Sequence, residues 1–224
     1  MKLIYTILCY LLMTVILSTG SQAQEISENI RTNAINAGVN PAAFDKVKKY
    51  YNKNKSNLEN KKFLAFVDFK RPSTKERLFV VNLNTGKVSK FLVTHGKNSG
   101  DNYATRFSNK NNSEKSALGL YKIQDEYKGK HGSSLRLVGL ENGLDQNNQE
   151  IPDSQINGIT NGKNSNALIR SIVMHSAYYA KPESIKANNN ERLGRSQGCP
   201  AVSPEDWKIL EPRLKNGSLL LLYK

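Results

Sequence analysis

Short apolar runs separated by polar segments dominate the chain from about residue 60 onwards. Runs rich in β-branched and aromatic residues, bounded by Gly, Asn and Ser, are typical of strands. Such runs cover residues 63–69, 78–83, 88–94, 117–123, 134–140 and 167–175. The turn sequence Asn84-Thr85-Gly86 predicts a hairpin between the second and third of them. Residues 96–115 and 141–166 are long and polar, which predicts loops between the strands.

The N-terminal part of the chain has a helical period instead. Apolar residues recur at a spacing of four in residues 25–58, and Asn40-Pro41 indicates the start of a second helix within that segment. We expect a small helical lead-in over residues 24–59 that carries no chemistry of its own.

A helix followed by a strand is predicted near the C-terminal end. Ser203 is a favourable N-cap, and Pro204 suits the first helical position. Asn216-Gly217 predicts the end of the helix, and the continuous apolar run 218–223 is typical of a central strand. Taken with the earlier runs, this predicts a mainly β domain with few helices over residues 60–224.

The first residues have the organisation of a signal peptide. Lys2 gives a positive start, residues 3–17 are almost entirely apolar, and small residues precede a cut after Ala23. An uncleaved membrane anchor is the alternative, but the apolar run is shorter than the roughly 20 residues that span a bilayer. Cys9 lies inside this run, where a lipid-anchored cysteine is not expected. We therefore expect residues 1–23 to be removed and the protein to be periplasmic or secreted.

The composition indicates a folded, strongly basic protein. The 224 residues are 38% hydrophobic and 23% charged, which is sufficient for a core. Lys and Arg number 33 against 19 Asp and Glu, which gives a net charge of +14. In an exported protein this charge favours anionic cell-wall polymers and lipid head groups, or serves solubility alone. Nucleic acid is not an expected partner, because the basic residues are spread along the chain without an aromatic-basic signature.

Cys199 is the only thiol that remains after removal of the signal peptide, so no internal disulfide can form. A lone thiol in an oxidising compartment needs an explanation, and burial as an inert apolar side chain is the simplest one. A catalytic thiol is the alternative. His175 can act as its base, because imidazole has a pKa of about 6.5. Gly198 leaves room for a substrate carbonyl to approach the backbone amides beside the thiol.

Two short motifs carry a family resemblance. His175-Ser176, followed by Arg195-Ser196-Gln197-Gly198-Cys199-Pro200, resembles the catalytic region of YkuD-type L,D-transpeptidases, above all the murein L,D-transpeptidase catalytic domain branch. Residues 94–100, 116–119, 130–132 and 135–137 are similar to the same branch, so the resemblance spans about residues 60–224. It implies a β-sandwich or curled sheet with a few helices, in which the nucleophile lies on a loop before the terminal helix.

The resemblance also implies roles for individual residues. Cys199 matches the nucleophile and His175 the general base, and the backbone carbonyl of Ser176 is a candidate for orienting the imidazole. The amides of Gly198 and Cys199 match the oxyanion donors, and Ser196 matches the hydroxyl of the motif.

Candidates for substrate binding surround these residues. The family motif has a histidine where this chain has Gln197, which keeps a donor and an acceptor but cannot act as a base. Arg195 and Arg192 are candidates for binding a carboxylate of the substrate, and His131 for lining the donor site. Solvated surface side chains are the alternative interpretation of these three.

The three histidines of the chain could alternatively be ligands of a metal ion. His95, His131 and His175 show no paired ligand spacing such as H-E-x-x-H. We therefore expect no metal, and the implied chemistry needs no nucleotide or other cofactor.

The implied activity is acyl transfer on peptidoglycan (murein) stem peptides. Cys199 attacks the carbonyl between the third, diamino residue and the terminal D-Ala, and an amine from a neighbouring stem resolves the thioester into a 3→3 cross-link. An L,D-carboxypeptidase or endopeptidase, in which water resolves the thioester, is one alternative. A non-catalytic cell-wall-binding module that uses the positive charge is the other.

Overall fold

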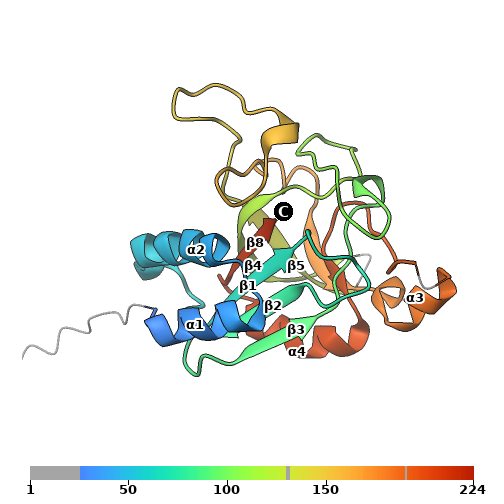
Figure 1. Cartoon of the computed structure of the whole chain (residues 1–224), viewed down its shortest axis with the longest axis horizontal. Coiled ribbons are helices and arrows are strands. Elements are labelled where there is room, and N and C mark those ends of the chain that lie inside the picture. Colours follow the sequence, from blue (N-terminus) through green and yellow to red (C-terminus); the bar gives the residue numbers. More distant parts are fainter. Residues whose placement is uncertain (1–25, 130–131, 190) are drawn as a thin grey trace, which may run out of the picture.

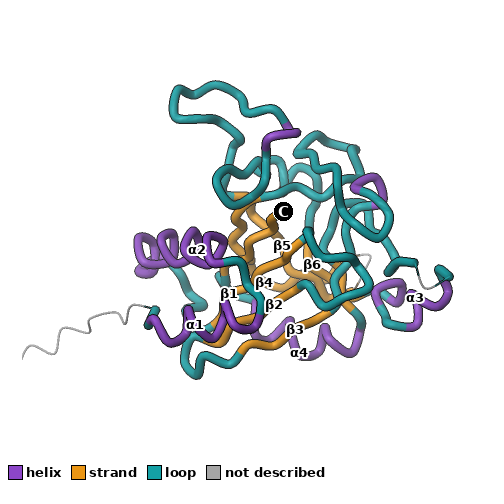
Figure 2. Tube along the Cα trace, viewed as in Figure 1, coloured by secondary structure: helices purple, strands orange, loops and turns teal. Residues whose placement is uncertain are grey.

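The computed structural model describes residues 26–129, 132–189 and 191–224. The expected signal peptide with Cys9, and His131, lie outside these described residues. Within them, no helix combines the length and the apolar character needed to cross a membrane. The prediction of a mainly β domain with few helices is confirmed (Figures 1 and 2).

The strands of the described residues form a single curled sheet. They are β1 (Phe63–Asp68), β2 (Leu78–Asn82), β3 (Val88–Phe91), β4 (Gly119–Gly129), β5 (Gly132–Gly139), β6 (Val173–Ser176), β7 (Ala201–Val202) and β8 (Leu219–Tyr223). Their order in the sheet is β3-β2-β1-β8-β4-β5-β6-β7. Two neighbouring pairs, β1 with β8 and β6 with β7, are parallel, and the other pairs are antiparallel. The expected fold therefore takes the form of a curled sheet and not of a sandwich of two sheets.

The last strand of the chain, β8, lies at the centre of the sheet. Its residues are all apolar and all buried. Successive side chains of a strand point to opposite faces, and accordingly Leu220 and Leu222 belong to one core while Leu219 and Leu221 belong to the other. A run without polar positions is what a strand buried on both faces requires. The prediction of a central strand over residues 218–223 is confirmed, with the strand beginning one residue later, at Leu219.

The helices cover the two faces of the sheet. The helices α1 (Glu28–Ala37) and α2 (Pro41–Asn54) pack on one face, α4 (Pro204–Leu214) packs on the other, and the short α3 (Glu183–Ala187) lies apart from them (Figure 1). Short 3-10 turns occur at η1 (Lys55–Asn57), η2 (Lys97–Ser99), η3 (Asp153–Gln155) and η4 (Tyr178–Ala180). The predicted helix starts are confirmed, because the side chains of Asn40 and Ser203 accept hydrogen bonds from the backbone N–H groups of Ala43 and Asp206.

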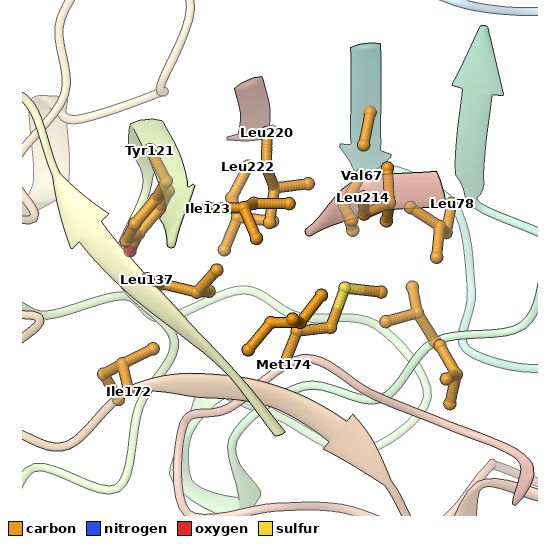
Figure 3. Packing of buried hydrophobic residues seen from close by; sticks show 14 of the residues in the cluster. Val67, Leu78, Tyr121, Ile123, Leu137, Ile172, Met174, Leu214, Leu220 and Leu222 are labelled. Carbon is orange, nitrogen blue, oxygen red and sulfur yellow. The ribbon is translucent and has the colours of Figure 1, made fainter. Parts of the chain in front are cut away.

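The core on the α4 side reaches from the sheet towards the loops that precede β6 and β7. Figure 3 shows residues of β1, β2, β4, β5 and β8 packed together with Ile172 and Met174. Tyr121 is fully buried there, and its hydroxyl donates to the Ala117 carbonyl at 2.9 Å. From α4, Trp207, Leu210 and Leu214 complete the packing. This core therefore gives β6 and the loop before β7 a rigid support.

The core on the other side joins the N-terminal helices to the sheet. Phe44 of α2 and Phe66 of β1 are both fully buried, and their rings stack with centroids 5.8 Å apart. Lys46 of α2 donates to Glu141 at 2.6 Å and to the Gly158 carbonyl at 2.8 Å. The helical lead-in therefore contributes directly to the hydrophobic packing of the sheet.

Phe44→Ala is expected to lower the free energy of unfolding by about 3–5 kcal/mol, because it leaves a cavity between α2 and the sheet. Urea unfolding followed by circular dichroism measures the loss. Lys49→Ala on the exposed face of the same helix is the matched control and should change stability by less than about 0.5 kcal/mol. A loss below about 1 kcal/mol for Phe44→Ala would instead mean that the helices detach without disturbing the sheet.

The expected strand over residues 167–175 is wrong in its first half. The backbone N–H of Arg170 bonds to the Asn166 carbonyl at 2.8 Å and that of Ser171 to the Leu168 carbonyl at 3.0 Å, which are turn hydrogen bonds. Ser171 also has a φ of +53°, outside the β region. Only Val173–Ser176 form a strand. A buried turn and a buried strand can both have an apolar sequence, so the pattern of apolar residues alone does not distinguish them.

The expected strand over residues 117–123 is longer in the structure, because β4 continues to Gly129. A register shift between Ile123 and Glu126 interrupts the pairing with β5. Such a bulge breaks the alternation of apolar and polar residues, which is why the polar second half of the strand has no recognisable β pattern.

Candidate active site

Cys199 lies on a tight turn that leads into β7. The Ser196 hydroxyl closes this turn, because it accepts a hydrogen bond from the Gly198 N–H at 3.1 Å and donates one to the Cys199 carbonyl at 2.6 Å. Gly198 has a φ of +122°, a conformation that favours glycine. Thr94 holds the far side of the turn, since its hydroxyl donates to the same carbonyl at 3.5 Å and accepts from the Ala201 N–H at 3.1 Å.

His175 comes from β6, the parallel neighbour of β7, and it pairs in register with Ala201. Its Nδ1 lies 2.8 Å from the backbone carbonyl oxygen of Ser176. A carbonyl oxygen only accepts, so this bond assigns a proton to Nδ1 and makes Nε2 the basic nitrogen of the neutral ring.

One cleft of about 770 Å³ brings the side chains of Cys199 and His175 together. Ser196, Gln197 and Arg195 line the same cleft. This volume is typical of sites that hold small molecules or a short peptide segment. Residues from the turn before β7 and from β6, far apart in the sequence, therefore converge on one concave surface.

Two backbone groups contact the sulfur of Cys199. The Val173 N–H donates to Sγ at 3.5 Å, and Sγ lies 3.9 Å from the Ser171 carbonyl oxygen. The N–H directed at sulfur favours the thiolate, whereas the carbonyl, which accepts from the S–H group, favours the thiol. Nearby, burial and then the charge of Cys199 raise the pKa of Tyr179 to about 12, which keeps that phenol protonated.

The two expected oxyanion donors differ in their surroundings. The Gly198 N–H already donates to the Ser196 hydroxyl, so it could serve an oxyanion only after that bond is released. The amide of Cys199, by contrast, belongs to the residue that lines the cleft itself.

Arg195 lies at the wall of the cleft, but part of its guanidinium is already used. Its Nη1 donates to the Lys97 carbonyl at 3.2 Å, to the Gly100 carbonyl at 3.0 Å and to Asp101 at 2.8 Å. Arg192 lies 3.9 Å from the same Asp101 carboxylate. Gln197 is exposed at the mouth of the cleft. The expected substrate-binding residues near Cys199 are therefore close to the thiol, with Arg195 held in place by the loop opposite.

His95 lies beneath the turn, away from the cleft surface. Its Nδ1 accepts from the buried Arg77 at 2.7 Å, and its Nε2 donates to the Gly100 carbonyl at 3.2 Å. Burial, reinforced by the charge of Arg77, lowers the pKa of His95 to about 4. Its own carbonyl accepts the Ser196 N–H at 2.9 Å, so His95 is a neutral support of the turn. Among the residues that the structure describes, no group of three or more His, Cys, Asp or Glu side chains is placed to hold a metal ion.

Arg170 and Tyr179 belong to the site although the sequence gives no motif for them, and Thr94 belongs to it although the resemblance of residues 94–100 assigns it no role. Arg170 and Tyr179 line the cleft, and Thr94 is fully buried behind it. The one available signal is that Arg170 interrupts an apolar run shortly before His175. Contacts between segments distant in the sequence, which no local pattern contains, define these three positions.

Gly198→Ala is expected to slow alkylation of Cys199 by iodoacetamide about tenfold or more. An added Cβ would lie 2.9 Å from the Lys115 carbonyl oxygen and would have to keep a φ of +122°, so the turn must move, and small displacements of reacting groups are costly. Gly217→Ala is the matched control, because Gly217 has a φ of +100° far from the cleft. Both variants should melt at lower temperature, but only Gly198→Ala should slow the alkylation. Equal alkylation rates would contradict this prediction.

The chain is similar to known proteins in both sequence and fold. A family model described as L,D-transpeptidase catalytic domain matches residues 35–151 and 152–223. No curated protein matches the sequence. An L,D-transpeptidase from Mycobacterium smegmatis is similar in structure, with 11% identity and a TM-score of 0.41, over 73% of this chain and 59% of that one. An L,D-transpeptidase from Stackebrandtia nassauensis is similar with 14% identity and a TM-score of 0.37, over 87% and 76% of the two chains. The chain thus spans less than two thirds of the length of the mycobacterial structure.

Proposed function

The chain belongs to the L,D-transpeptidase catalytic domain family, and on this basis we propose that it is an exported cysteine acyltransferase that acts on peptidoglycan stem peptides. The observation that carries the proposal is the single cleft that Cys199 and His175 both line, with Nδ1 of the imidazole held by the Ser176 carbonyl. A thiol with a correctly oriented base in an open cleft is the arrangement that acyl transfer requires.

In the first half of the reaction, Nε2 of His175 takes the thiol proton and the sulfur of Cys199 attacks the carbonyl between the third, diamino residue and the terminal D-Ala. The carbonyl carbon becomes tetrahedral and its oxygen carries the negative charge. When the C–N bond breaks, His175 returns the proton to the nitrogen, and D-Ala leaves as an amine. A thioester between the stem peptide and Cys199 remains.

The developing oxyanion needs a hydrogen-bond donor beside the sulfur. We assign this role first to the backbone N–H of Cys199, and to that of Gly198 only if the bond to Ser196 opens during the reaction. In the resting enzyme Ser196 positions the nucleophile, because its hydroxyl holds the Cys199 carbonyl at 2.6 Å.

In the second half, an amine of a neighbouring stem peptide attacks the thioester, His175 accepts its proton, and an amide bond replaces the thioester. The product is a 3→3 cross-link, and the thiol is regenerated. An L,D-carboxypeptidase or endopeptidase uses water in place of the amine. Both share the first half-reaction, so only the products separate them. A non-catalytic wall-binding module would need neither residue.

Arg195 and Gln197 are proposed to contact the substrate. Nη1 of Arg195 is occupied, but Nε and Nη2 have no acceptor among the described residues, so they can bind a carboxylate of the stem peptide. Gln197 offers one donor and one acceptor group at the mouth. His131 is retained as a further candidate on the grounds of the sequence alone. No metal or other cofactor enters the proposed steps.

Export is the part of the proposal that rests on residues 1–23. The sequence supports cleavage near Ala23 and a location in the periplasm or outside the cell. Mass analysis of the mature protein from its native host tests this, since the expected N-terminal residue is Gln24.

Two mass-spectrometric measurements test the activity. After incubation with a carbapenem, intact-mass and peptide analysis should find a covalent adduct on Cys199, as the family resemblance implies. After incubation with isolated stem peptides or sacculi, analysis of the muropeptides should find 3→3 cross-linked dimers if an amine resolves the thioester. Shortened, uncross-linked stems alone would identify a hydrolase, and unchanged muropeptides together with an unmodified thiol would contradict an enzyme.

A further inference from the structure

Arg170 lies in the turn before β6 and connects three parts of the site. Its Nη1 donates to the Ser108 carbonyl at 2.8 Å, and its Nη2 donates to the Ser113 hydroxyl at 3.2 Å and to the Lys115 carbonyl at 2.6 Å. All of these acceptors are uncharged. The guanidinium is thus fixed in place while its positive charge is not neutralised by them.

This charge lies directly behind the turn of residues 196–199, which carries Cys199 and is called the nucleophile turn below. A Cβ added at Gly198 would lie 3.2 Å from Nη2 of Arg170, so the guanidinium is separated from the turn by little more than the missing side chain. Arg170 lines the catalytic cleft together with Cys199, and it also lines a second, polar cleft of about 360 Å³ on the other side of Gln197.

Arg170 differs from the other cations of the catalytic cleft in its partners. Lys97 is paired with Glu114 at 2.7 Å, and Arg195 is paired with Asp101 at 2.8 Å. Within the described residues, Arg170 has no carboxylate within ion-pair distance, and no Asp or Glu lines the cleft. A partly buried cation without an anion is unfavourable, and the group beside it that can become an anion is the sulfur of Cys199.

We propose that Arg170 is a positioning residue whose guanidinium stabilises the thiolate of Cys199, in addition to the contribution of His175. The proposal deepens the proposed function and rests on it for its catalytic meaning. The same three hydrogen bonds that fix Arg170 also connect residues 108–115 to the turn, so the charge is delivered from a rigid position. Charge–charge attraction at this range is little screened, because the guanidinium is partly buried.

The other groups that act on the sulfur come from several elements. The titratable or charged side chains that line the cleft besides Arg170 are Lys97 of η2, Tyr127 of β4, His175 of β6, Tyr179 of η4 and Arg195 just before the nucleophile turn. Beneath them lies the buried Tyr121, which is electrostatically coupled to both Cys199 and Arg170. Burial raises the pKa values of Tyr121 and Tyr179, so both phenols stay neutral near pH 7 and do not oppose the thiolate.

The pH dependence of Cys199 alkylation by iodoacetamide tests the proposal, because it reports the thiolate fraction and needs no peptidoglycan. In Arg170→Gln the midpoint should rise by about one pH unit, and the rate below the midpoint should fall about tenfold. Arg170→Lys keeps the charge and should retain most of the wild-type behaviour. Arg213→Gln removes an arginine that bonds to Ser89 and does not line the catalytic cleft, so it should leave the midpoint unchanged.

A second measurement tests the proposal even if Arg170→Gln does not fold. In His175→Ala the midpoint should stay below the ordinary thiol value of about 8.5, because Arg170 remains. A midpoint at or above that value in His175→Ala, or an unchanged midpoint in a folded Arg170→Gln, overturns the proposal. Melting temperatures recorded in parallel distinguish stabilisation of the thiolate from a purely structural role of Arg170. A purely structural role would lower the melting temperature without moving the midpoint. Failure of the proposed function would instead leave these midpoints intact and abolish only the reaction with stem peptides.

Discussion

Cys199→Ala is expected to abolish both the release of D-Ala and the formation of 3→3 cross-links, with turnover reduced by at least about 10³-fold. The physical reason is that the other hydroxyl groups lining the cleft, those of Ser171, Ser196 and Tyr179, are far less readily ionised than a thiol, so they cannot take over the covalent step. Mass spectrometry of muropeptides and a chromatographic assay of free D-Ala measure the loss.

Cys199→Ser provides the more demanding control. A hydroxyl is far less readily ionised than a thiol, so an imidazole activates it much less well in a site arranged for a thiolate. The serine variant should therefore be nearly as inactive as the alanine variant, and both should melt near the wild-type temperature. Full cross-linking by either variant, or a cell-wall function that survives in both, would favour the binding-module alternative over the enzyme.

His175→Ala is expected to lower turnover by about 10²–10⁴-fold, the usual contribution of a positioned general acid and base. The alkylation rate of Cys199 should fall much less, because Arg170 and the Val173 N–H still favour the thiolate. Turnover depends on His175 twice, since the leaving amine needs a proton that the thiolate cannot supply. Comparison of single-turnover acylation with alkylation measures the two effects separately.

A conservative variant sharpens this result. His175→Gln keeps a donor that can bond to the Ser176 carbonyl, but it cannot take a proton. It should preserve the local structure of β6 and still lose turnover. If His175→Gln were as active as the wild type, another group would have to act as the base, and the assignment of His175 would be wrong.

The fold could be predicted wherever a local pattern has one physical cause. The run from residue 219 to 223 is apolar throughout, as a strand buried on both faces requires. Ser203 and Asn40 fix helix starts through hydrogen bonds within three residues. The turn at Ser171 could not be predicted, because its positive φ is imposed on a residue that ordinarily avoids it.

The site could be predicted only in part, for a related reason. The motif around Cys199 is contiguous in the sequence. It therefore predicts a turn that carries the nucleophile, and in the structure the Ser196 hydroxyl closes this turn. Arg170, however, acquires its role from carbonyls of Ser108 and Lys115, more than fifty residues earlier in the chain. The sequence near Arg170 does not indicate these contacts, because they form only when the sheet is assembled.

The central place of β8 has a consequence for the order of assembly. Within the described residues β1 and β4 share no edge, and β8 alone is paired with both. A ribosome-bound chain that lacks residues 219–223 can therefore form two separate half-sheets but cannot close them. Such a late, non-local closure slows folding, so the two half-sheets are expected to persist as separate units until the strand that joins them has been synthesised.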